Sequence, residues 1–133
     1  SRCSVVGWSF GGMVAQHLAL RHPEVVSSLV LACCTAGGKG EESYPLHELE
    51  LGGLDARTKA ERKISLLDSR SEVLPESVQR SMEFDQAQRE RNESTPGAVE
   101  GERRQLKARA GHDVQAMLRS LSIRTLVVAG EFN

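Results

Sequence analysis

Gly7-Trp8-Ser9-Phe10-Gly11-Gly12 is the stretch of this 133-residue chain that decides the fold. It follows residues 3–6, a short run with β-branched side chains, and precedes residues 13–21, where apolar side chains recur at helical spacing. The helix should stop at His22, because the proline after it disfavours the α conformation in the preceding residue. Residues 25–34 then form a second apolar run of strand length. This order predicts a β-α-β unit, in which helices cover parallel strands.

The hexapeptide matches G-x-S-x-G, the pattern of a nucleophile elbow, in which a strained strand-to-helix turn exposes one serine hydroxyl. The pattern alone is weak, but the flanking strand and helix make it specific. We expect Gly7 and Gly11 to occupy positions where a Cβ would clash, and Gly12 to let the helix approach the sheet closely. Ser9 is therefore the candidate catalytic nucleophile. The alternative is a glycine-rich turn that merely carries a serine.

Two aromatic residues, Trp8 and Phe10, flank the serine. The helix should begin at or just after Ser9, so its first amides and the positive end of its dipole face the place where negative charge develops during acyl transfer. The backbone N–H of Phe10 is therefore the expected oxyanion donor. The side chains of Trp8 and Phe10 are candidates for binding substrate, and packing in the core is the equal alternative.

With these residues the chain resembles the α/β-hydrolase family. Residues 123–133, Ile-Arg-Thr-Leu-Val-Val-Ala-Gly-Glu-Phe-Asn, are similar to the late core strand of that family. Residues 43–49 and 105–113 are similar to lactonase- and esterase-like members related to 3-oxoadipate enol-lactonases. The resemblance implies an α/β class, a partial α/β-hydrolase fold with a parallel-sheet core and an inserted helical cap. It also implies an internal fragment of one larger domain, with early strands upstream and the last strand and helix downstream.

Composition divides the chain into two kinds of sequence. Between residues 1 and 36 the only charged residues are Arg2, Arg21 and Glu24, as expected of buried strands and a central helix. Between residues 57 and 109 charge is dense and of mixed sign, which is typical of solvated helices. The resemblance identifies this charged interval as the cap. We expect residues 1–38 to contain the first strand, the elbow, the helix and the next strand. Residues 39–111 should form the cap. Residues 112–133 should contain a return helix over 113–120 and the late core strand.

The catalytic groups of this fold follow one another in the order serine, acid, histidine. The resemblance puts the acid three residues after Gly130, at Asn133, and the histidine beyond it. An amide lacks the charge that stabilises an imidazolium, and an Asp→Asn change in a serine protease triad costs about 10⁴ in kcat. Three explanations stay open. In the first, the acid comes from elsewhere, although Glu41 and Glu42 stand too late in the sequence and Glu131 should point the wrong way. In the second, the protein is a weakened or non-catalytic member of the family. In the third, Asn133 reflects where the fragment was cut.

None of the four histidines meets the requirements of a general base. His17 and His22 lie along the helix that starts at the serine, too far from its first turn. His112 adjoins Asp113 in sequence, and sequence neighbours do not form the oriented pair of a triad. His47, at the start of the cap, is a tentative substrate-binding residue, beside the more ordinary role of a surface or capping residue.

Charge, cysteines and hydropathy exclude several classes of protein. The 17 basic and 18 acidic residues give a net charge of −1, so there is no electrostatic footprint for nucleic acid and no polybasic membrane patch. No apolar stretch reaches the roughly 18 residues that span a bilayer, and no signal peptide is visible. Cys3, Cys33 and Cys34 are expected to be small core residues in a reducing compartment, which favours a cytoplasmic protein. No spacing of metal ligands is present, so neither a metal nor a cofactor is expected.

These observations predict a serine hydrolase that acts on a small-molecule ester or lactone through an acyl-enzyme on Ser9. The catalytic histidine and the second oxyanion donor should lie outside the chain, so the 133 residues alone are expected to be inactive. The alternative, motivated by Asn133, is a hydrolase-fold protein that binds a small ligand without turnover. The expected partner is a small-molecule substrate, with no nucleic acid and no membrane, and the oligomeric state stays open.

Overall fold

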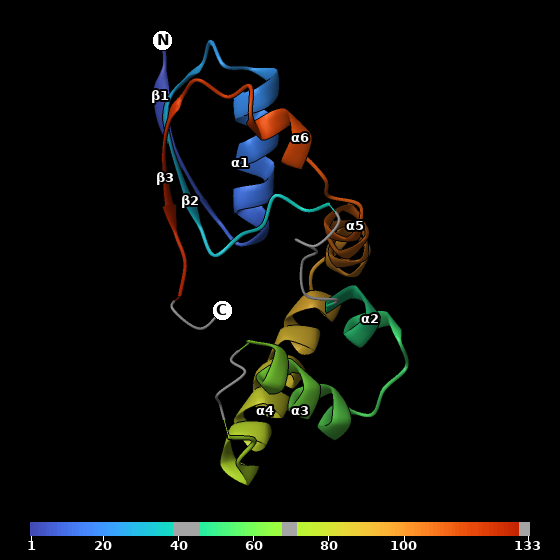
Figure 1. The fold of residues 1–133 in the computed structure, drawn as a ribbon. Coiled ribbons are helices and arrows are strands. Elements are labelled where there is room, and N and C mark those ends of the chain that lie inside the picture. The colour runs from blue at the N-terminus through green and yellow to red at the C-terminus, as the bar shows by residue number, and fades with distance from the viewer. Residues whose placement is uncertain (39–45, 68–71, 131–133) are drawn as a thin grey trace. The chain divides into compact units, whose positions relative to one another are not determined.

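The computed structural model of the chain describes residues 1–38, 46–67 and 72–130 (Figure 1). These residues form two compact units. The sheet unit contains residues 1–38 and 111–130, and the helical unit contains residues 46–67 and 72–110.

Three parallel strands form the sheet unit, in the order β1-β2-β3. They span Cys3–Trp8 (β1), Val26–Ala32 (β2) and Arg124–Val128 (β3). The register pairs Trp8 with Ala32 and Ala32 with Val128, so the carboxyl ends of all three strands meet at one edge of the sheet (Figure 1). The parallel sheet with flanking helices confirms the predicted α/β class.

α1, which spans Phe10–Arg21, covers one face of the sheet, and α6, Gln115–Leu118, lies on the same side (Figure 1). The core between α1 and the strands is small and apolar. It consists of Ala15 and Ala19 from α1 and Val26, Leu29 and Leu31 from β2. The two alanines are four residues apart, so they share the helix face that lies against the sheet. Their small side chains let α1 lie close to the strands.

The segment that returns to the sheet is less helical than predicted. α6 contains four residues, whereas the sequence predicts a helix over 113–120. Asp113 forms an isolated antiparallel bridge with Gly37, and the Val114 amide donates to the Ala36 carbonyl over 2.9 Å. These contacts hold residues 113 and 114 outside the helix and tie the return segment to the residues that follow β2.

Two glycines of the hexapeptide have no room for a side chain. A Cβ on Gly7 would lie 2.6 Å from both the Gly11 carbonyl oxygen and Gly12 Cα, and a Cβ on Gly12 would lie 2.5 Å from Cys34 Sγ. The expectation for Gly11 is wrong, because a Cβ there meets no atom within 4 Å among the described residues. Gly11 lies on the exposed side of the first turn of α1. The close approach therefore depends on Gly7 and Gly12.

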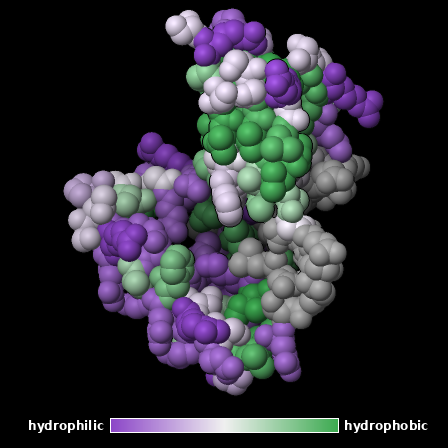
Figure 2. Space-filling model, turned by 90° about the vertical axis from the view of Figure 1, so that its left-hand side faces the viewer, coloured by the Kyte–Doolittle hydropathy of each residue, from purple (hydrophilic) through white to green (hydrophobic). Residues whose placement is uncertain are grey.

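The face of the sheet opposite α1 exposes apolar side chains. Side chains alternate along a strand, so Val6 and Trp8 share this face, and the register places Leu126 and Val128 in the same rows across the sheet. Val6 and Trp8 are each 72% exposed, and Leu126 is 58% exposed. Figure 2 shows this face as a continuous hydrophobic patch. An open face of this composition is unusual, because parallel sheets are generally covered on both sides.

Four helices make up the helical unit. They span Leu46–Leu51 (α2), Ala56–Leu67 (α3), Pro75–Glu93 (α4) and Ala98–Ala110 (α5). The helices have few buried residues, as the charged sequence predicts; those on α2, α3 and α4 include Leu49, Ala60 and Val78. No helix within the three described ranges is long and apolar enough to cross a membrane.

A cluster of ion pairs joins the first three helices of this unit. The buried Lys59 of α3 pairs with Glu50 of α2, and its Nζ lies 3.7 Å from a carboxylate oxygen of Asp85 on α4. Lys63, one turn after Lys59, pairs with the same Asp85 at 2.8 Å. Removing one partner of such a group leaves a poorly solvated charge, which is strongly destabilising. The charged sequence of this unit therefore supplies interior contacts as well as solvated surface.

Alanine substitutions at the crowded Gly7 and at the uncrowded Gly11 should have opposite effects on stability. Gly7→Ala forces a Cβ against backbone atoms of α1, so we expect the free energy of unfolding to fall by about 1–3 kcal/mol. Gly11→Ala has open space and lies in a helix, so it should leave stability unchanged or raise it by up to about 1 kcal/mol. Urea unfolding of both variants measures the difference. Equal destabilisation by the two alanines would contradict this account of the turn.

Candidate active site

Ser9 joins the end of β1 to the start of α1 in a conformation that non-glycine residues rarely adopt. Its φ is 50° and its ψ is −120°. The conformation is held on both sides, because the Ser9 amide donates to the Ala32 carbonyl over 2.9 Å and the Ser9 carbonyl accepts from the Gly12 amide over 2.9 Å. Backbone strain of this kind costs on the order of 1–3 kcal/mol and is concentrated at functional sites. The Ser9 residue is exposed, and its side chain makes no capping hydrogen bond to α1.

The first turn of α1 offers free backbone donors beside this serine. The Phe10 amide has no acceptor among the described residues, as expected at the start of a helix. No acidic side chain lies in the first turn of α1, so the positive end of its dipole is not neutralised locally. The arrangement can stabilise a negatively charged oxygen next to Ser9, which is the requirement of acyl transfer.

The two flanking aromatic residues differ in burial. Trp8, the last residue of β1, is largely exposed in the described structure. Phe10, the first residue of α1, is half-buried. The Trp8 ring is therefore available at the strand end that precedes Ser9.

A second strained residue lies at the same edge of the sheet. Cys33 follows β2 with a φ of 49°, and its amide donates to the Val128 carbonyl over 2.8 Å. Both strained turns thus stand at carboxyl ends of strands, where open α/β sheets bind their ligands. The expectation that the cysteines are core residues is wrong for Cys3, which is exposed, while Cys33 and Cys34 are partly buried and follow β2.

Cys34 does not compete with Ser9 as a nucleophile. Burial raises the pKa of the Cys34 thiol above its usual value, and the hydrogen bond from Gln16 opposes this rise only in part. The neutral thiol therefore predominates at neutral pH, and the thiol is a poorer nucleophile than the thiolate.

The other predicted site residues belong to the helical unit or lie outside the described residues. His47, the second residue of α2, belongs to the helical unit, and its Nε2 lies 3.9 Å from a carboxylate oxygen of Glu48. Asn133, the expected acid position, lies outside the described residues, as do Glu131, Glu41 and Glu42. Within the described parts of the chain, no group of three or more His, Cys, Asp or Glu side chains could hold a metal ion.

Gln16 and His112 form a buried polar contact that sequence analysis missed. They are 96 residues apart, yet His112 Nε2 lies 2.9 Å from Gln16 Oε1 and both residues are buried. The Gln16 amide group donates to the Thr35 carbonyl over 3.2 Å, which leaves Gln16 Oε1 to accept from the histidine ring. The His17 ring meets His112 edge-on, with centroids 5.3 Å apart. The one sequence signal for this contact was Gln16 itself, a polar residue beside the small apolar residues of the helix face that is buried.

This network fixes the helix that begins at Ser9. It joins α1 to the segment that leaves the sheet unit after β2 and to the segment that returns to it. Gly37 permits the approach of these two segments, because a Cβ there would run into the His112 carbonyl and its φ is 71°. The three segments are therefore held together by hydrogen bonds and by one position that requires glycine.

A match to a known family covers almost the whole chain. The family profile described as alpha/beta hydrolase fold matches residues 2–133. The chain belongs to the α/β hydrolase fold family. This result confirms the resemblance seen in the sequence and the fold class, while the lactonase-like branch stays a prediction.

Curated relatives of this α/β hydrolase are similar over a short segment. A pimeloyl-(acyl-carrier protein) methyl ester esterase of Chromobacterium violaceum is 49% identical over 41 residues, which are 31% of this chain and 16% of the relative. The enzyme of the same name from Aeromonas hydrophila is 39% identical over 44 residues, 33% of this chain and 17% of the relative.

Solved structures share the fold over nearly the whole chain. A thermophilic esterase matches with a TM-score of 0.64 at 24% identity, covering 99% of this chain and 47% of that structure. A meta-cleavage product hydrolase from Pseudomonas fluorescens IP01, complexed with acetates, matches with a TM-score of 0.60 at 20% identity, covering 97% and 46%. The chain thus spans less than half the length of these structures.

The buried network makes the stability of this α/β hydrolase sensitive to acid. Burial and the neighbouring His17 lower the pKa of His112, while a hydrogen bond with the Thr35 backbone and the Asp113 carboxylate oppose the change. Below about pH 6.5, the ordinary pKa of histidine, the unfolded chain therefore binds more protons than the folded chain, and the free energy of unfolding should fall. Each unit of pKa difference corresponds to about 1.4 kcal/mol.

Urea unfolding at about pH 7.5 and about pH 5.5 measures this dependence. His112→Gln keeps an amide donor for Gln16 and should flatten the pH dependence of the free energy of unfolding. His22→Gln changes an exposed histidine at the end of α1 and should retain it. The same pH dependence in wild type and His112→Gln would contradict the role of the buried ring.

Proposed function

We propose that the protein carrying this chain hydrolyses a carboxylic ester of a small molecule through an acyl-enzyme on Ser9. The observation that carries the proposal is the backbone of Ser9, strained and held between β1 and α1. The strain places an exposed hydroxyl beside the free amide of Phe10, at the edge where α/β sheets bind ligands. The esterase relatives of the matched segment support an ester as the substrate bond.

In the proposed reaction Ser9 Oγ forms a bond to the carbonyl carbon while its proton passes to a histidine outside the described residues. The carbonyl oxygen becomes an oxyanion and accepts a hydrogen bond from the Phe10 N–H. Collapse of this intermediate breaks the bond to the alcohol oxygen, which takes the proton from the histidine. A water molecule then hydrolyses the acyl-enzyme by the same steps and releases the carboxylic acid. A lactone, as an internal ester, would follow this course, with both products in one molecule.

One sequence feature favours a second function. Asn133 stands where the family resemblance expects the triad acid, and an amide does not supply the charge that stabilises an imidazolium. A protein of this fold that binds a small ligand without turnover is therefore the competing proposal. The two functions differ in whether the Ser9 hydroxyl is activated.

Reaction with a fluorophosphonate probe distinguishes the two functions in the full-length protein. An activated serine forms a covalent adduct with the probe, so wild type should be labelled and Ser9→Ala should lose essentially all labelling. Ser27→Ala is the matched control, because Ser27 is an exposed serine elsewhere in the sheet unit, and its labelling should equal that of wild type. Labelling retained in Ser9→Ala would refute the nucleophile, and no labelling of folded wild type would favour ligand binding without turnover.

The oxyanion role of the Phe10 amide can be separated from that of its side chain. Phe10→Pro removes the N–H at the first helical position, whereas Phe10→Ala removes the ring and keeps the N–H. We expect kcat/KM for an ester substrate to be lower in Phe10→Pro than in Phe10→Ala by about 10²–10³. Far-UV circular dichroism verifies that both variants are folded. Equal activity of the two folded variants would contradict the oxyanion role.

A further inference from the structure

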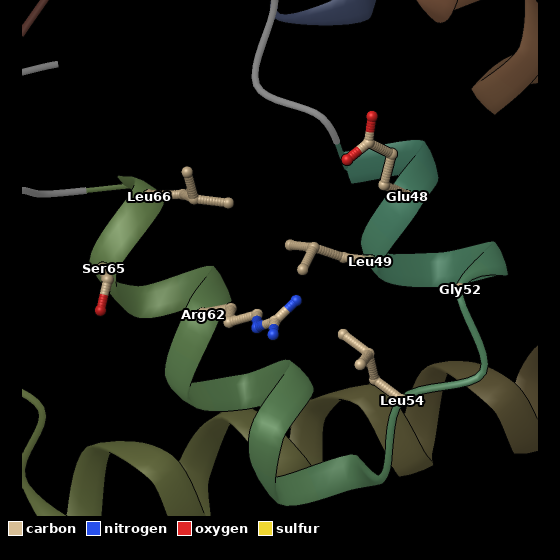
Figure 3. Close-up of a pocket in the computed structure, with 7 residues that line it drawn as sticks. All are labelled: Glu48, Leu49, Gly52, Leu54, Arg62, Ser65 and Leu66. Atoms are coloured by element: carbon tan, nitrogen blue, oxygen red, sulfur yellow. The ribbon is translucent and has the colours of Figure 1, made fainter.

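The helical unit contains a cavity of about 450 Å³ between α2 and α3 (Figure 3). This volume lies within the range of about 300–1,000 Å³ that is typical of small-molecule sites. All the residues that line the cavity belong to the helical unit, and Ser9 belongs to the sheet unit.

Three leucines form apolar walls of this cavity. Leu49 comes from α2, Leu54 from the loop after it, and Leu66 from the last turns of α3, and Figure 3 shows the three side chains converging on the space between the helices. Gly52 shapes the bend between α2 and the loop, because a Cβ there would run into the Glu48 carbonyl. The walls can thus hold a hydrocarbon chain, which gains free energy as it leaves water.

One cation points into this apolar space. Figure 3 shows the Arg62 guanidinium directed from α3 toward Leu49 and Leu54. The other cations of α3 have carboxylate partners: Arg57 pairs with Glu61, Lys59 with Glu50 and Asp85, and Lys63 with Asp85. Arg62 has no ion-pair partner in the part of the chain that the structure describes. Among the described residues, α3 therefore presents one cation without a carboxylate partner, the exposed Arg62, and this residue lines the cavity.

The polar side chains at the rim of the cavity have other partners among the described residues than the Arg62 guanidinium. The Glu48 side chain turns away from Arg62 in Figure 3, and its carboxylate lies 3.9 Å from His47 Nε2. The Ser65 hydroxyl donates to the Glu61 carbonyl of its own helix over 3.1 Å. The N–H donors of Arg62 are consequently available to a ligand.

We propose that this cavity binds a monocarboxylate with an unbranched hydrocarbon chain. The planar guanidinium matches a carboxylate through two parallel hydrogen bonds, and the chain lies against the three leucines. A neutral alcohol of the same length leaves the guanidinium without a counter-charge, and a dicarboxylate places its second charge against apolar walls. Binding at this cavity does not require the proposed hydrolase reaction, although that reaction releases a ligand of the same chemical class.

Isothermal titration of the full-length protein with octanoate tests the site. We expect octanoate to bind with one site per chain and Arg62→Gln to weaken this binding at least about tenfold, because charge-assisted hydrogen bonds are lost. Acetate has the charge without the chain and octanol has the chain without the charge, so both should bind more weakly than octanoate. All titrations use the same ionic strength.

Arg57→Gln is the matched control, since it removes an exposed arginine of the same helix that already has the partner Glu61. Its octanoate affinity should equal that of wild type, and circular dichroism verifies the fold of both variants. Equal affinity of wild type and Arg62→Gln would overturn the proposal, as would octanol binding as tightly as octanoate or no octanoate binding at millimolar concentration. Absence of fluorophosphonate labelling in folded wild type would count against the proposed hydrolase reaction and leave the octanoate result untouched.

Discussion

The contact between β1 and the first turn of α1 is the constraint on which the sheet unit depends. A Cβ at Gly7 would overlap the backbone of Gly11 and Gly12, so the two elements meet as closely as they do only without that side chain. This approach forces the chain to reverse within one residue, and Ser9 takes the strained conformation. The hydrogen bond from the Ser9 amide to Ala32 extends the parallel ladder past the end of β1 and stabilises the turn. The geometry of the candidate nucleophile thus follows from backbone packing.

Polar contacts between distant segments then hold α1 in place. The core beneath the helix is made of small side chains, and α1 carries a polar residue, Gln16, where it meets the chain on either side of the helical unit. Buried polar groups are costly unless their hydrogen bonds are satisfied, so Gln16, Thr35 and His112 depend on one another. Protonation of His112 disturbs this group, which links acid sensitivity to the position of α1.

In the helical unit, charge pairing replaces much of what a large apolar core would provide. Lys59 pairs with carboxylates of α2 and α4, and Lys63 pairs with the same carboxylate of α4, so these contacts set the neighbours of α3. Arg62 stands between these lysines in sequence and directly before Lys63, from which it is turned by about 100° around the helix axis. Arg62 is exposed, lines the cavity and has no carboxylate partner among the described residues, which distinguishes the α2–α3 space from an ordinary packing gap.

Local chemistry was sufficient to predict the turn. The glycine spacing around Ser9, the β-branched run before it and the helical periodicity after it act over a few residues, and the structure has the predicted strand, turn, helix and strand. Gly11 was misjudged because the clash depends on which side of α1 faces the strand, and the motif alone does not define that direction. The return helix was predicted too long because the backbone of Asp113 and Val114 pairs with residues after β2.

The sequence by itself determined the β-α-β order, the α/β class and the position of the candidate nucleophile, because these depend on backbone preferences and short-range spacing. Only the tertiary structure decided that Gln16 meets His112, that Trp8 is exposed, and that Arg62 lines a cavity without a carboxylate partner among the described residues. A charged run such as 61–63 has the same local pattern whether its side chains meet water, a carboxylate or a cavity. The difference arises from residues that are distant in the chain, and their positions are fixed only when the helices and strands pack together.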